Sequence, residues 1–396
     1  MTNEQKNVPK LRFPEFKGEW TNEKVSAFLK ESKIKGHKGN NAKKLTVKLW
    51  GKGVVEKKQI FQGSNNTQYY IRKAGQLMYG KLDFLNCAFG IVPTELDNYE
   101  STIDSPSFDF IEGDQNFLLE RIKMKSFYKK YGDIANGSRK AKRINQDTFL
   151  SMSLYAPNIR EQAKIGDFFS KLDRQIELEE QKLAKLEEQK KGYIQKIFSQ
   201  QLLFKDENGN EYPDWEEKKL GDILERGNKG KVNEIGKYRR LTISLHGKGL
   251  YEVKQERKTK DTRPFYQRFE GELIIGKQNF FNGSIAIVTR EFNGFICSNA
   301  IMSYKISNHV NRKYLLEYLL QNDFLRKHEY LADGTGQKEL SEKKFEELEI
   351  KLPNSINEQQ KIGVFLERLD NLIEKQSNKL ELLKQRKKSF LQKMFV

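Results

Sequence analysis

The sequence of residues 45–56, LTVKLWGKGVVE, returns later in the chain at residues 241–252 as LTISLHGKGLYE. The repeat extends along the whole chain, and its period is far longer than the roughly 20–50 residues of a solenoid unit. The other matched positions are Trp20 and Trp215, Gly80-Lys81 and Gly276-Lys277, Pro157 and Pro353, Glu161-Gln162 and Glu358-Gln359, and Leu172-Asp173 and Leu369-Asp370. We interpret the repeat as a duplicated domain. Two similar domains suit a partner with approximate two-fold symmetry, and duplex DNA is such a partner.

The charge of the chain also favours a polyanionic partner. Lys and Arg number 72 against 54 for Asp and Glu, which gives a formal net charge of +18 and raises the expectation of nucleic-acid binding. From charge alone, the alternative is a basic protein with solvated faces. Two cysteines, Cys87 and Cys297, give no disulfide framework. Because no signal peptide or apolar run of about 18 residues is present, we expect a cytoplasmic protein with no membrane partner.

Each half of the chain divides into a globular part and a helical part. Short β-rich runs broken by glycine predict an α+β fold for residues 1–157 and 201–353. Each globular part should also contain a helix, near residues 117–131 in the first and 314–330 in the second. The polar, turn-forming residues 205–214 mark the boundary between the halves.

A heptad pattern predicts long helices at residues 158–200 and 354–396, each with about 38 helical residues and roughly 57 Å in length. Apolar residues recur in alternating steps of four and three, and two polar residues interrupt each seam. The seam is longer than that of an ordinary helix packed on its own domain, so we expect the two helices to form an antiparallel coiled coil with pseudo-two-fold symmetry. The residues expected to pair are Ile176, Glu179, Leu183, Leu186 and Lys190 in the first helix, and Ile373, Gln376, Leu380, Leu383 and Lys387 in the second.

One antiparallel register satisfies all four polar interruptions at once. It places Glu179 opposite Lys387, and Lys190 opposite Gln376. The apolar pairs in this register are Leu183 with Leu383, Leu186 with Leu380, Ile176 with Phe390, and Tyr193 with Ile373. A parallel pairing would instead set Lys190 beside Lys387, which is an unfavourable contact between like charges.

Catalytic signatures are mostly absent from the sequence. Its four histidines have no zinc-site spacing, so no metal site is expected. The glycine-rich stretch at residues 227–231 resembles a phosphate-binding loop, but Val232 stands where such a loop needs a hydroxyl group. Pro213-Asp214 with Glu252-Val253-Lys254 faintly resembles a metal-dependent nuclease, and an enzyme acting on nucleic acid is the alternative function.

Binding chemistry recurs in both halves. Glycines allow close backbone approach, while lysine and asparagine offer donors to phosphates and base edges, although the glycines could serve turns alone. A third loop, matched between residues 135–143 and 332–338, adds hydroxyl and basic side chains. The predicted DNA-binding residues are Lys52, Lys81, Asn86, Ser138, Arg139 and Lys140 in the first half, and Lys248, Lys277, Asn279, Asn282, Thr335, Gln337 and Lys338 in the second.

The ordered set of repeated motifs resembles the specificity (S) subunit of type I restriction–modification enzymes. The resemblance covers the whole chain. Its most specific parts are a proline followed by Glu-Gln-x-x-Ile and Leu-Asp, and then a long heptad helix that closes on Gln-Lys-Ile-Phe or Gln-Lys-Met-Phe. These parts occur once after Pro157 and once after Pro353.

The resemblance implies a non-catalytic DNA-recognition subunit. Residues 1–157 and 201–353 would be target-recognition domains, each reading one half of a bipartite DNA site in the major groove. The helices at 158–200 and 354–396 would space them and bind two modification (M) subunits, through which restriction (R) subunits join. S-adenosylmethionine, ATP and Mg²⁺ would belong to those partners, with no cofactor on this chain. Because the segments at 59–66 and 255–262 differ, we expect an asymmetric site.

Overall fold

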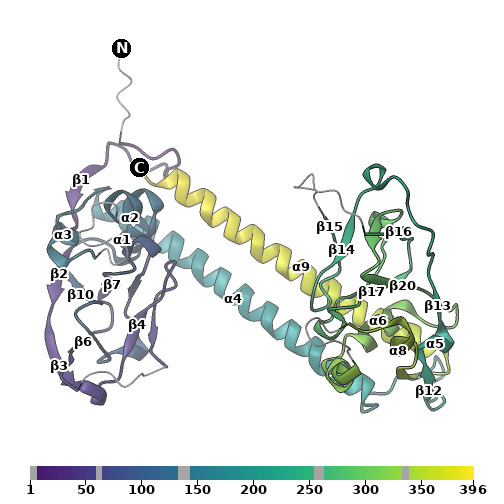
Figure 1. Ribbon diagram of the computed structural model, residues 1–396. Helices are drawn as coiled ribbons and strands as arrows, with labels where there is room; N and C mark the ends of the chain where they lie inside the picture. The colour runs from purple at the N-terminus through teal and green to yellow at the C-terminus, as the bar shows by residue number, and fades with distance from the viewer. Residues whose placement is uncertain (1–6, 59–64, 133–142, 254–262, 332–338) are drawn as a thin grey trace. The chain divides into compact units, whose positions relative to one another are not determined.

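A computed structural model describes residues 7–58, 65–132, 143–253, 263–331 and 339–396 (Figure 1). The chain forms two compact units. The first comprises Met1–Gln181 and Asn378–Val396, and the second comprises Lys182–Ser377. Each unit therefore contains one globular domain together with a segment of both long helices.

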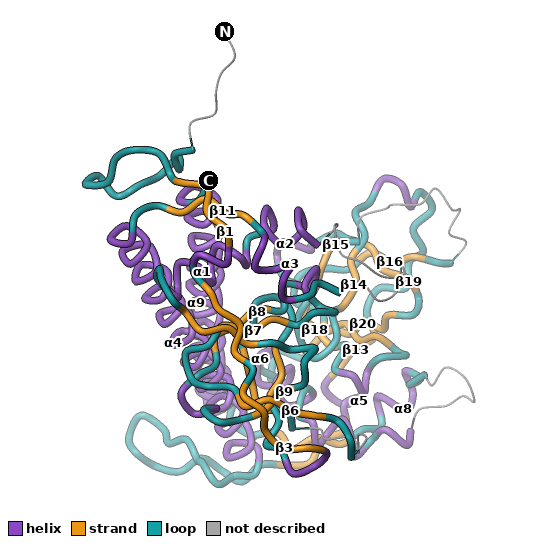
Figure 2. The backbone as a smooth tube through the Cα atoms, turned by 90° about the vertical axis from the view of Figure 1, so that its left-hand side faces the viewer, coloured by secondary structure: helices purple, strands orange, loops and turns teal. Residues whose placement is uncertain are grey.

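The first unit is built on antiparallel sheets, whose strands are drawn in orange in Figure 2. Its central sheet has the order β2 (Leu29–Ser32), β10 (Ser107–Phe110), β7 (Leu77–Tyr79) and β8 (Phe89–Ile91). A second sheet has the order β3 (Ile34–Lys38), β6 (Gln68–Ile71) and β9 (Glu100–Ser101), and the two-stranded pairs are β1 (Thr21–Lys24) with β11 (Ser153–Ala156), and β4 (Leu45–Val47) with β5 (Val54–Glu56). All three residues of β7 are buried, which places this strand at the centre of the domain.

Short helices cover the central sheet of the first unit. They are α1 (Gln115–Lys123), α2 (Lys125–Gly132) and α3 (Gln146–Ser151). The single helix predicted near residues 117–131 is thus two helices, because Met124 takes an extended conformation between them. Asp114 caps α1 by accepting a hydrogen bond from the N–H of Phe117 (2.8 Å). Tyr79 packs on Phe149 beneath the helices, with 4.6 Å between ring centroids.

The second unit repeats this architecture. Its central sheet has the order β13 (Leu224–Arg226), β20 (Ile301–Ile306), β17 (Leu273–Gly276) and β18 (Ile285–Ile287). The two-stranded pairs are β12 (Glu216–Lys219) with β21 (Glu349–Leu352), β14 (Leu241–Ile243) with β15 (Leu250–Glu252), and β16 (Phe265–Gln267) with β19 (Ile296–Ser298). The counterpart of β3 is reduced to an isolated bridge between Lys231 and Tyr266.

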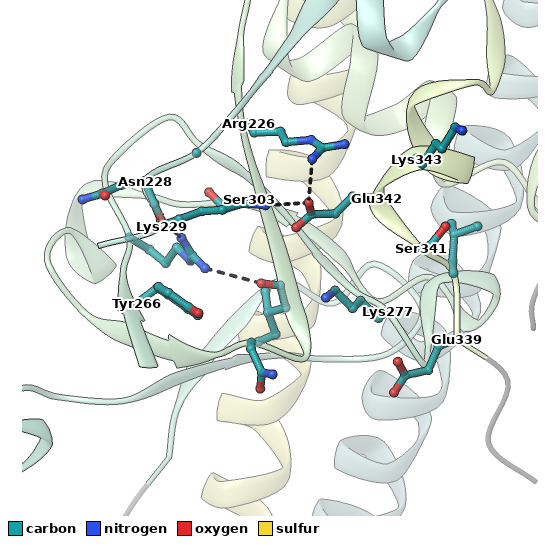
Figure 3. Close-up of a pocket in the computed structure, with 15 residues that line it drawn as sticks. Arg226, Asn228, Lys229, Tyr266, Lys277, Ser303, Glu339, Ser341, Glu342 and Lys343 are labelled. Carbon is teal, nitrogen blue, oxygen red and sulfur yellow. Dashed lines mark hydrogen bonds and ion pairs between the residues drawn. The ribbon is translucent and has the colours of Figure 1, made fainter. Parts of the chain in front are cut away.

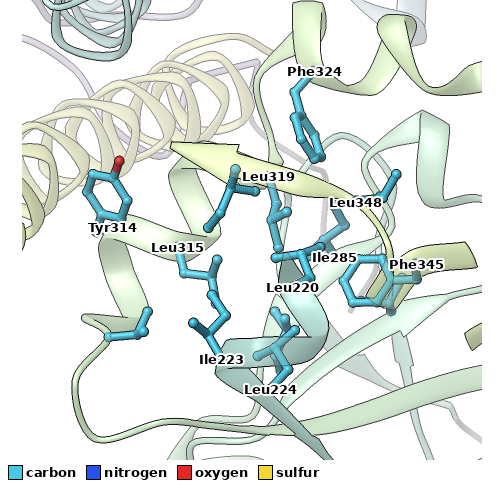
Figure 4. Close-up of a cluster of buried hydrophobic side chains, with 14 of the residues drawn as sticks. Leu220, Ile223, Leu224, Ile285, Tyr314, Leu315, Leu319, Phe324, Phe345 and Leu348 are labelled. Carbon is cyan, nitrogen blue, oxygen red and sulfur yellow. The ribbon is translucent and has the colours of Figure 1, made fainter. Parts of the chain in front are cut away.

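The core of the second unit lies between its sheet and its short helices (Figure 4). These helices are α5 (Leu220–Ile223), α6 (Arg312–Leu319), α7 (Asn322–Lys327) and α8 (Glu342–Glu346). Leu220, Ile223, Leu315, Leu319 and Phe345 are buried against one another in this core. Burial of each such side chain contributes about 1.5–3 kcal/mol of transfer free energy.

Two long helices complete the fold, and their prediction after Pro157 and Pro353 is confirmed. Helix α4 (Ile159–Phe198) has 40 residues, and α9 (Ile356–Met394) has 39. Each helix enters the cores of both units. In the first unit the core contains Ile165 and Phe169 from α4 and Met394 from α9, and in the second it contains Ile197 from α4 and Ile362 from α9. The motifs that close the two helices are therefore anchors for the globular domains.

The repeated Glu-Gln motif fixes the start of each long helix. In both units the glutamine amide binds the carbonyl of the preceding proline and the N–H of the residue that caps a short helix of the globular domain. The bonds are Gln162 Nε2 to Pro157 O (2.8 Å), Asp114 N to Gln162 Oε1 (3.2 Å), Gln359 Nε2 to Pro353 O (2.8 Å) and Asn311 N to Gln359 Oε1 (2.8 Å). The motif is a structural joint between helix and domain.

The glutamates of this motif have different partners in the two units. Arg12 donates to both carboxylate oxygens of Glu161, at 2.7 and 2.6 Å. Glu358 accepts only the indole N–H of Trp215 (3.1 Å), and its Oε2 has no partner among the described residues. Burial raises the pKa of Glu358.

In each unit, side chains of α4 meet side chains of α9 in antiparallel order. In the first unit Phe168 packs on Phe390, with ring centroids 5.1 Å apart. Asp173 binds Lys387 there, and Glu179 binds Lys379. In the second unit, Tyr193 packs on Phe365 at 5.1 Å, and Lys190 binds Asp370 at 2.6 Å. The ten residues predicted to pair are all buried or half-buried, whereas Tyr193, which the predicted register also uses, is 38% exposed.

The expected pairing register is wrong by about one heptad. Lys387 binds Asp173 instead of Glu179, and Lys190 binds Asp370 instead of Gln376. Phe390 packs on Phe168, and Tyr193 packs on Phe365. Each of these partners lies eight residues from the one that the heptads predicted, Ile176 and Ile373. The same expected register included the pairs Leu183 with Leu383 and Leu186 with Leu380. The physical reason is that the seam residues Lys387 and Lys190 bind Asp173 and Asp370, which lie outside the seams.

The second carboxylate of each lysine comes from the globular domain. Lys387 lies 3.2 Å from Glu120 of α1, and Lys190 lies 3.0 Å from Glu317 of α6. Burial acts to raise the pKa of Glu120, but the charges of Lys123 and Lys387 outweigh it and lower the pKa. We call Lys387–Asp173–Glu120 and Lys190–Asp370–Glu317 the two lysine latches. Each latch joins both long helices to one domain.

We expect a double-mutant cycle to detect the latch. Asp173→Asn and Lys387→Met should show a coupling energy of roughly 1–2 kcal/mol in urea unfolding, because the two side chains share one network. Glu179→Gln with Lys387→Met serves as the control and should be additive within about 0.5 kcal/mol. Strong coupling in the control cycle, with none in the first, would restore the register that the heptads predicted.

The two glutamates should respond in opposite ways to the same substitution. Glu358→Gln keeps an acceptor for Trp215 and removes a buried charge, so it should stabilise the protein by about 0.5–1 kcal/mol at neutral pH. Glu161→Gln breaks the pair with Arg12 and should cost roughly 3 kcal/mol.

The gain from Glu358→Gln should depend on pH. A raised folded-state pKa means that the folded protein holds this proton more tightly, so the parent loses stability as pH rises from the ordinary glutamate pKa through the raised value. The gain should therefore vanish in acid and appear above that window. Unfolding measured from pH 4 to pH 8 tests this, and a gain that is equal at all pH values contradicts it.

Candidate nucleic-acid interface

The Gly-Lys-Gly loop has the same backbone geometry in both units. Trp50 and His246 begin the loops with φ angles of 61° and 58°, a conformation that is uncommon for residues other than glycine. The N–H of Trp50 donates to Asn86 O, and the N–H of His246 donates to Asn282 O, both at 2.8 Å. The fold therefore fixes the shape of the loop, while the side chain at its start differs between the copies.

The structure brings two of the predicted groups together in each unit. Lys52 and Lys248 are both exposed, in the loops that join β4 to β5 and β14 to β15. Asn86, Asn279 and Asn282 lie in the adjoining turns, where Asn86 is half-buried and the other two are exposed. All five side chains thus lie at least partly open to a partner on the surface.

The inner side of the first loop faces charges of both signs. Trp50 and Lys52 line a cavity of about 620 Å³ in the first unit. Its charged residues from α1, α4 and α9 are Glu120, Lys123, Asp173, Glu177, Glu180, Lys384, Lys387 and Lys388. Because the four carboxylates offset the four lysines of these helices, the wall gives a phosphate no net attraction, and we expect the loop to meet DNA with its outer face.

The lysines of the second predicted group have unequal positions. Lys81 is buried, with 9% of its surface exposed, and this burial lowers the pKa of its ammonium group. Its counterpart Lys277 is half-buried and lines an open cavity. The position of Lys81 does not suit contact with a DNA phosphate, and the glycine–lysine match in the sequence gave no sign of this difference.

The third predicted loop lies outside the described residues in both units. It carries Ser138, Arg139 and Lys140 in the first half, and Thr335, Gln337 and Lys338 in the second. Their contribution to DNA binding stays a prediction.

Sequence reasoning missed a basic strand in the first unit. Lys35 and Lys38 of β3 are exposed beside β6, where Tyr69 and Tyr70 are half-buried. Lys44 lies over the Tyr69 ring at 4.8 Å. The sequence signal is the two lysines of β3 together with the tyrosine pair of β6, because basic and aromatic side chains together suit nucleic acids.

The second unit has arginines in the corresponding region. Arg239 lies over Phe295 and Arg240 over Phe265, each 4.5 Å from the ring centroid. Arg239 also binds Glu252, one of the residues that faintly resembled a nuclease motif. Trp50 was missed as well, although it is the most informative of these residues: 62% of its surface is exposed, which is unusual for tryptophan.

A polar cavity of about 720 Å³ lies in the second unit among β13, β16, β20 and α8 (Figure 3). Two ion pairs hold its wall. Arg226 Nε binds Glu346 Oε1 at 2.6 Å, and Lys229 Nζ binds Glu342 Oε2 at 2.7 Å. The bond from Arg226 lowers the pKa of Glu346. Asn228 and Lys229 belong to the glycine-rich stretch that resembled a phosphate-binding loop.

The described residues offer no metal site. Among them, no group of three or more His, Cys, Asp or Glu side chains is placed to hold a metal ion. Within the same part of the chain, no helix has the length and apolar character needed to cross a membrane.

Solved structures share this fold across nearly the whole chain. The type I restriction–modification system S subunit from M. genitalium has a TM-score of 0.63 at 16% identity, covering 98% of this chain and 99% of that one. A chain from a study of complex assembly and conformational transition of the type I R–M system has a TM-score of 0.50 at 14% identity, covering 95% and 97%. At such identities the likeness concerns the fold alone.

The family match comes from the sequence of both halves. Residues 21–188 and residues 212–385 each match the model of the type I restriction modification DNA specificity domain. Each match begins at the globular domain and continues into the following long helix. Two matched domains with the fold described above show that the chain belongs to the family of type I restriction–modification DNA specificity proteins.

Proposed function

We propose that this chain is the specificity subunit of a type I restriction–modification system, in which each globular domain reads one half of a bipartite, asymmetric DNA site. The observation that carries the proposal is the duplicated loop. Its backbone is the same in both units, but Trp50 in one is replaced by His246 in the other. Two loops with the same backbone and different side chains suit two domains that recognise different base sequences.

We further propose that α4 and α9 form an antiparallel coiled coil that spaces the two domains and binds two M subunits. The lysine latches support this role, because they tie helices and domain together in each unit. Both helices also expose large apolar side chains that suit a protein partner. These are Leu178, Val364, Leu372 and Leu382. R subunits would join through the M subunits.

In this proposal the chain performs no chemistry itself. S-adenosylmethionine, ATP and Mg²⁺ would be bound by the partner subunits. The alternative, an enzyme acting on nucleic acid, predicts cleavage or methylation by the purified chain in the presence of Mg²⁺, ATP or S-adenosylmethionine.

Reconstitution tests the proposal directly. The purified chain alone should leave DNA unchanged with every cofactor, and it should direct methylation to one sequence once M subunits are added. Methylome sequencing of a host that carries the system should then show a bipartite, non-palindromic site. Activity of the chain alone, or a palindromic site, would count against the proposal.

The loop lysines should contribute phosphate contacts. Lys52→Ala and Lys248→Ala should weaken DNA binding by the assembled complex, and each should reduce the slope of log affinity against log salt by about 0.9, the value for one lysine–phosphate pair. Lys81→Ala is the matched control, and its slope should equal that of the parent because Lys81 is buried. Parental slopes for Lys52→Ala and Lys248→Ala would assign these loops a structural role.

A further inference from the structure

The polar cavity of the second unit has more positive than negative charge facing it. Arg226 and Lys229 are neutralised by Glu346 and Glu342, as described above. Three other lining cations have no ion pair among the described residues. They are Arg268, Lys277 and Lys343.

The acidic groups around the cavity are already engaged. Glu339 accepts a hydrogen bond from Gln278 Nε2 (2.8 Å). Glu272 lies behind the wall, where it accepts the hydroxyl of Ser303 (2.9 Å) and the N–H of Phe269 (3.2 Å). Neither carboxylate forms an ion pair with the cavity cations within the described part of the chain, so an anion in the cavity would find unpaired positive charge.

Among these cations, Arg268 gives the strongest indication of an anion-binding site. Only 3% of its surface is exposed, and a buried charge normally requires a paired counter-charge. Its described hydrogen-bond acceptors are weak or neutral: Cys297 Sγ at 3.0 Å, Asn228 O at 3.1 Å and Ile301 O at 3.4 Å. Its guanidinium carbon also lies 5.5 Å from the centroid of the Tyr266 ring. A guanidinium group has five N–H donors, and these three bonds leave two without a described acceptor.

Lys277 and Tyr266 complete the set of donors. Their side chains approach the cavity from opposite sides (Figure 3). No hydrogen bond or ion pair joins the Lys277 ammonium group to another described residue, whereas its backbone is fixed by bonds to Ala300 O (3.0 Å) and from Leu340 N (3.0 Å). A fixed backbone with an unengaged ammonium group suits binding of an anion that arrives from outside.

The first unit has a different arrangement at the matched positions. Glu31 of β2 stands where Arg226 stands in β13, and it accepts a hydrogen bond from Gln146 Nε2 (2.8 Å). Arg72, the counterpart of Arg268, binds the hydroxyls of Ser101 and Ser107 at 2.7 and 3.0 Å. Of the matched cations in the first unit, Arg72 is thus bonded to hydroxyls and Lys81 is buried.

We propose that the cavity of the second unit binds a phosphate group between Arg268, Lys277 and Lys343, and that the first unit has no equivalent site. Guanidinium and ammonium groups are the usual partners of phosphate in proteins. The phosphate is either part of a DNA backbone or a free phosphate species. The DNA source rests on the proposed function, while binding of free phosphate does not.

Two measurements on the full-length chain test the site. The first is the shift of the thermal midpoint by inorganic phosphate, with chloride at equal ionic strength as the reference. Phosphate should stabilise the parent but not Lys277→Gln, and Glu339→Gln should show a larger shift because an opposing charge is removed. Lys351→Gln removes an exposed charge of β21 outside the cavity and should behave like the parent.

The second measurement is the salt dependence of DNA binding by the chain assembled with its M subunits. Lys277→Gln should reduce the slope by about 0.9, the value for one phosphate contact, and Lys351→Gln should not. A change in this measurement, with or without the phosphate effect, assigns the site to the DNA backbone. A change in the phosphate measurement alone assigns it to a free phosphate species.

The proposal is overturned if Lys277→Gln matches Lys351→Gln in both measurements. If Lys277→Gln fails to fold, Lys343→Gln takes its place, because Lys343 is exposed on α8 and its removal should not disturb the core. If the parent complex shows no specific DNA binding, the proposed function fails, and the phosphate measurement still decides whether the site exists.

Discussion

In each unit one lysine of a long helix binds an aspartate of the other long helix and a glutamate of the globular domain. Lys387 and Lys190 are mostly withdrawn from water, and so are the glutamates they bind. Removing Lys387 would leave Glu120 with Lys123 alone, and removing Lys190 would leave Glu317 with Lys313 alone. Each buried carboxylate would thus lose one of its two counter-charges, which is costly in a protein interior. The latch therefore fixes three things at once: which residues of α4 and α9 meet, in which direction the helices run, and where each domain attaches.

Both copies keep the same attachment of the long helix to the globular domain, but the residues around that attachment differ. Both Gln162 and Gln359 bind the same backbone groups. The glutamate beside each has diverged in its chemistry. Glu161 is neutralised by Arg12, whereas Glu358 holds only an indole N–H and has a raised pKa. A duplicated domain thus tolerates an unpaired buried carboxylate in one copy, because the glutamine and the core already secure the start of the helix.

The sequence was sufficient to predict the duplication, the α+β class and both long helices, because repeats and heptads are local patterns. It was insufficient for the helix register. Polar residues in a seam were expected to face each other, but Lys387 and Lys190 reach Glu120 and Glu317, which come from distant helices. The burial of Lys81 could not be predicted for the same reason. Whether a lysine after a glycine reaches the surface depends on tertiary neighbours, and the glycine–lysine pair is the same in both copies.

The contrast between a conserved backbone and variable side chains explains how one fold can present two different chemical surfaces. The Gly-Lys-Gly loops are held by backbone hydrogen bonds, so their shape is independent of the side chains they carry. A change from Trp50 to His246 alters the chemical surface and leaves those bonds intact. The same holds at the cavity, where exchanging Glu31 for Arg226 reverses the charge at one position of matching strands. Because the latches lie on the long helices and the short helices beside them, such exchanges alter what each domain can bind without moving the domain on its helices.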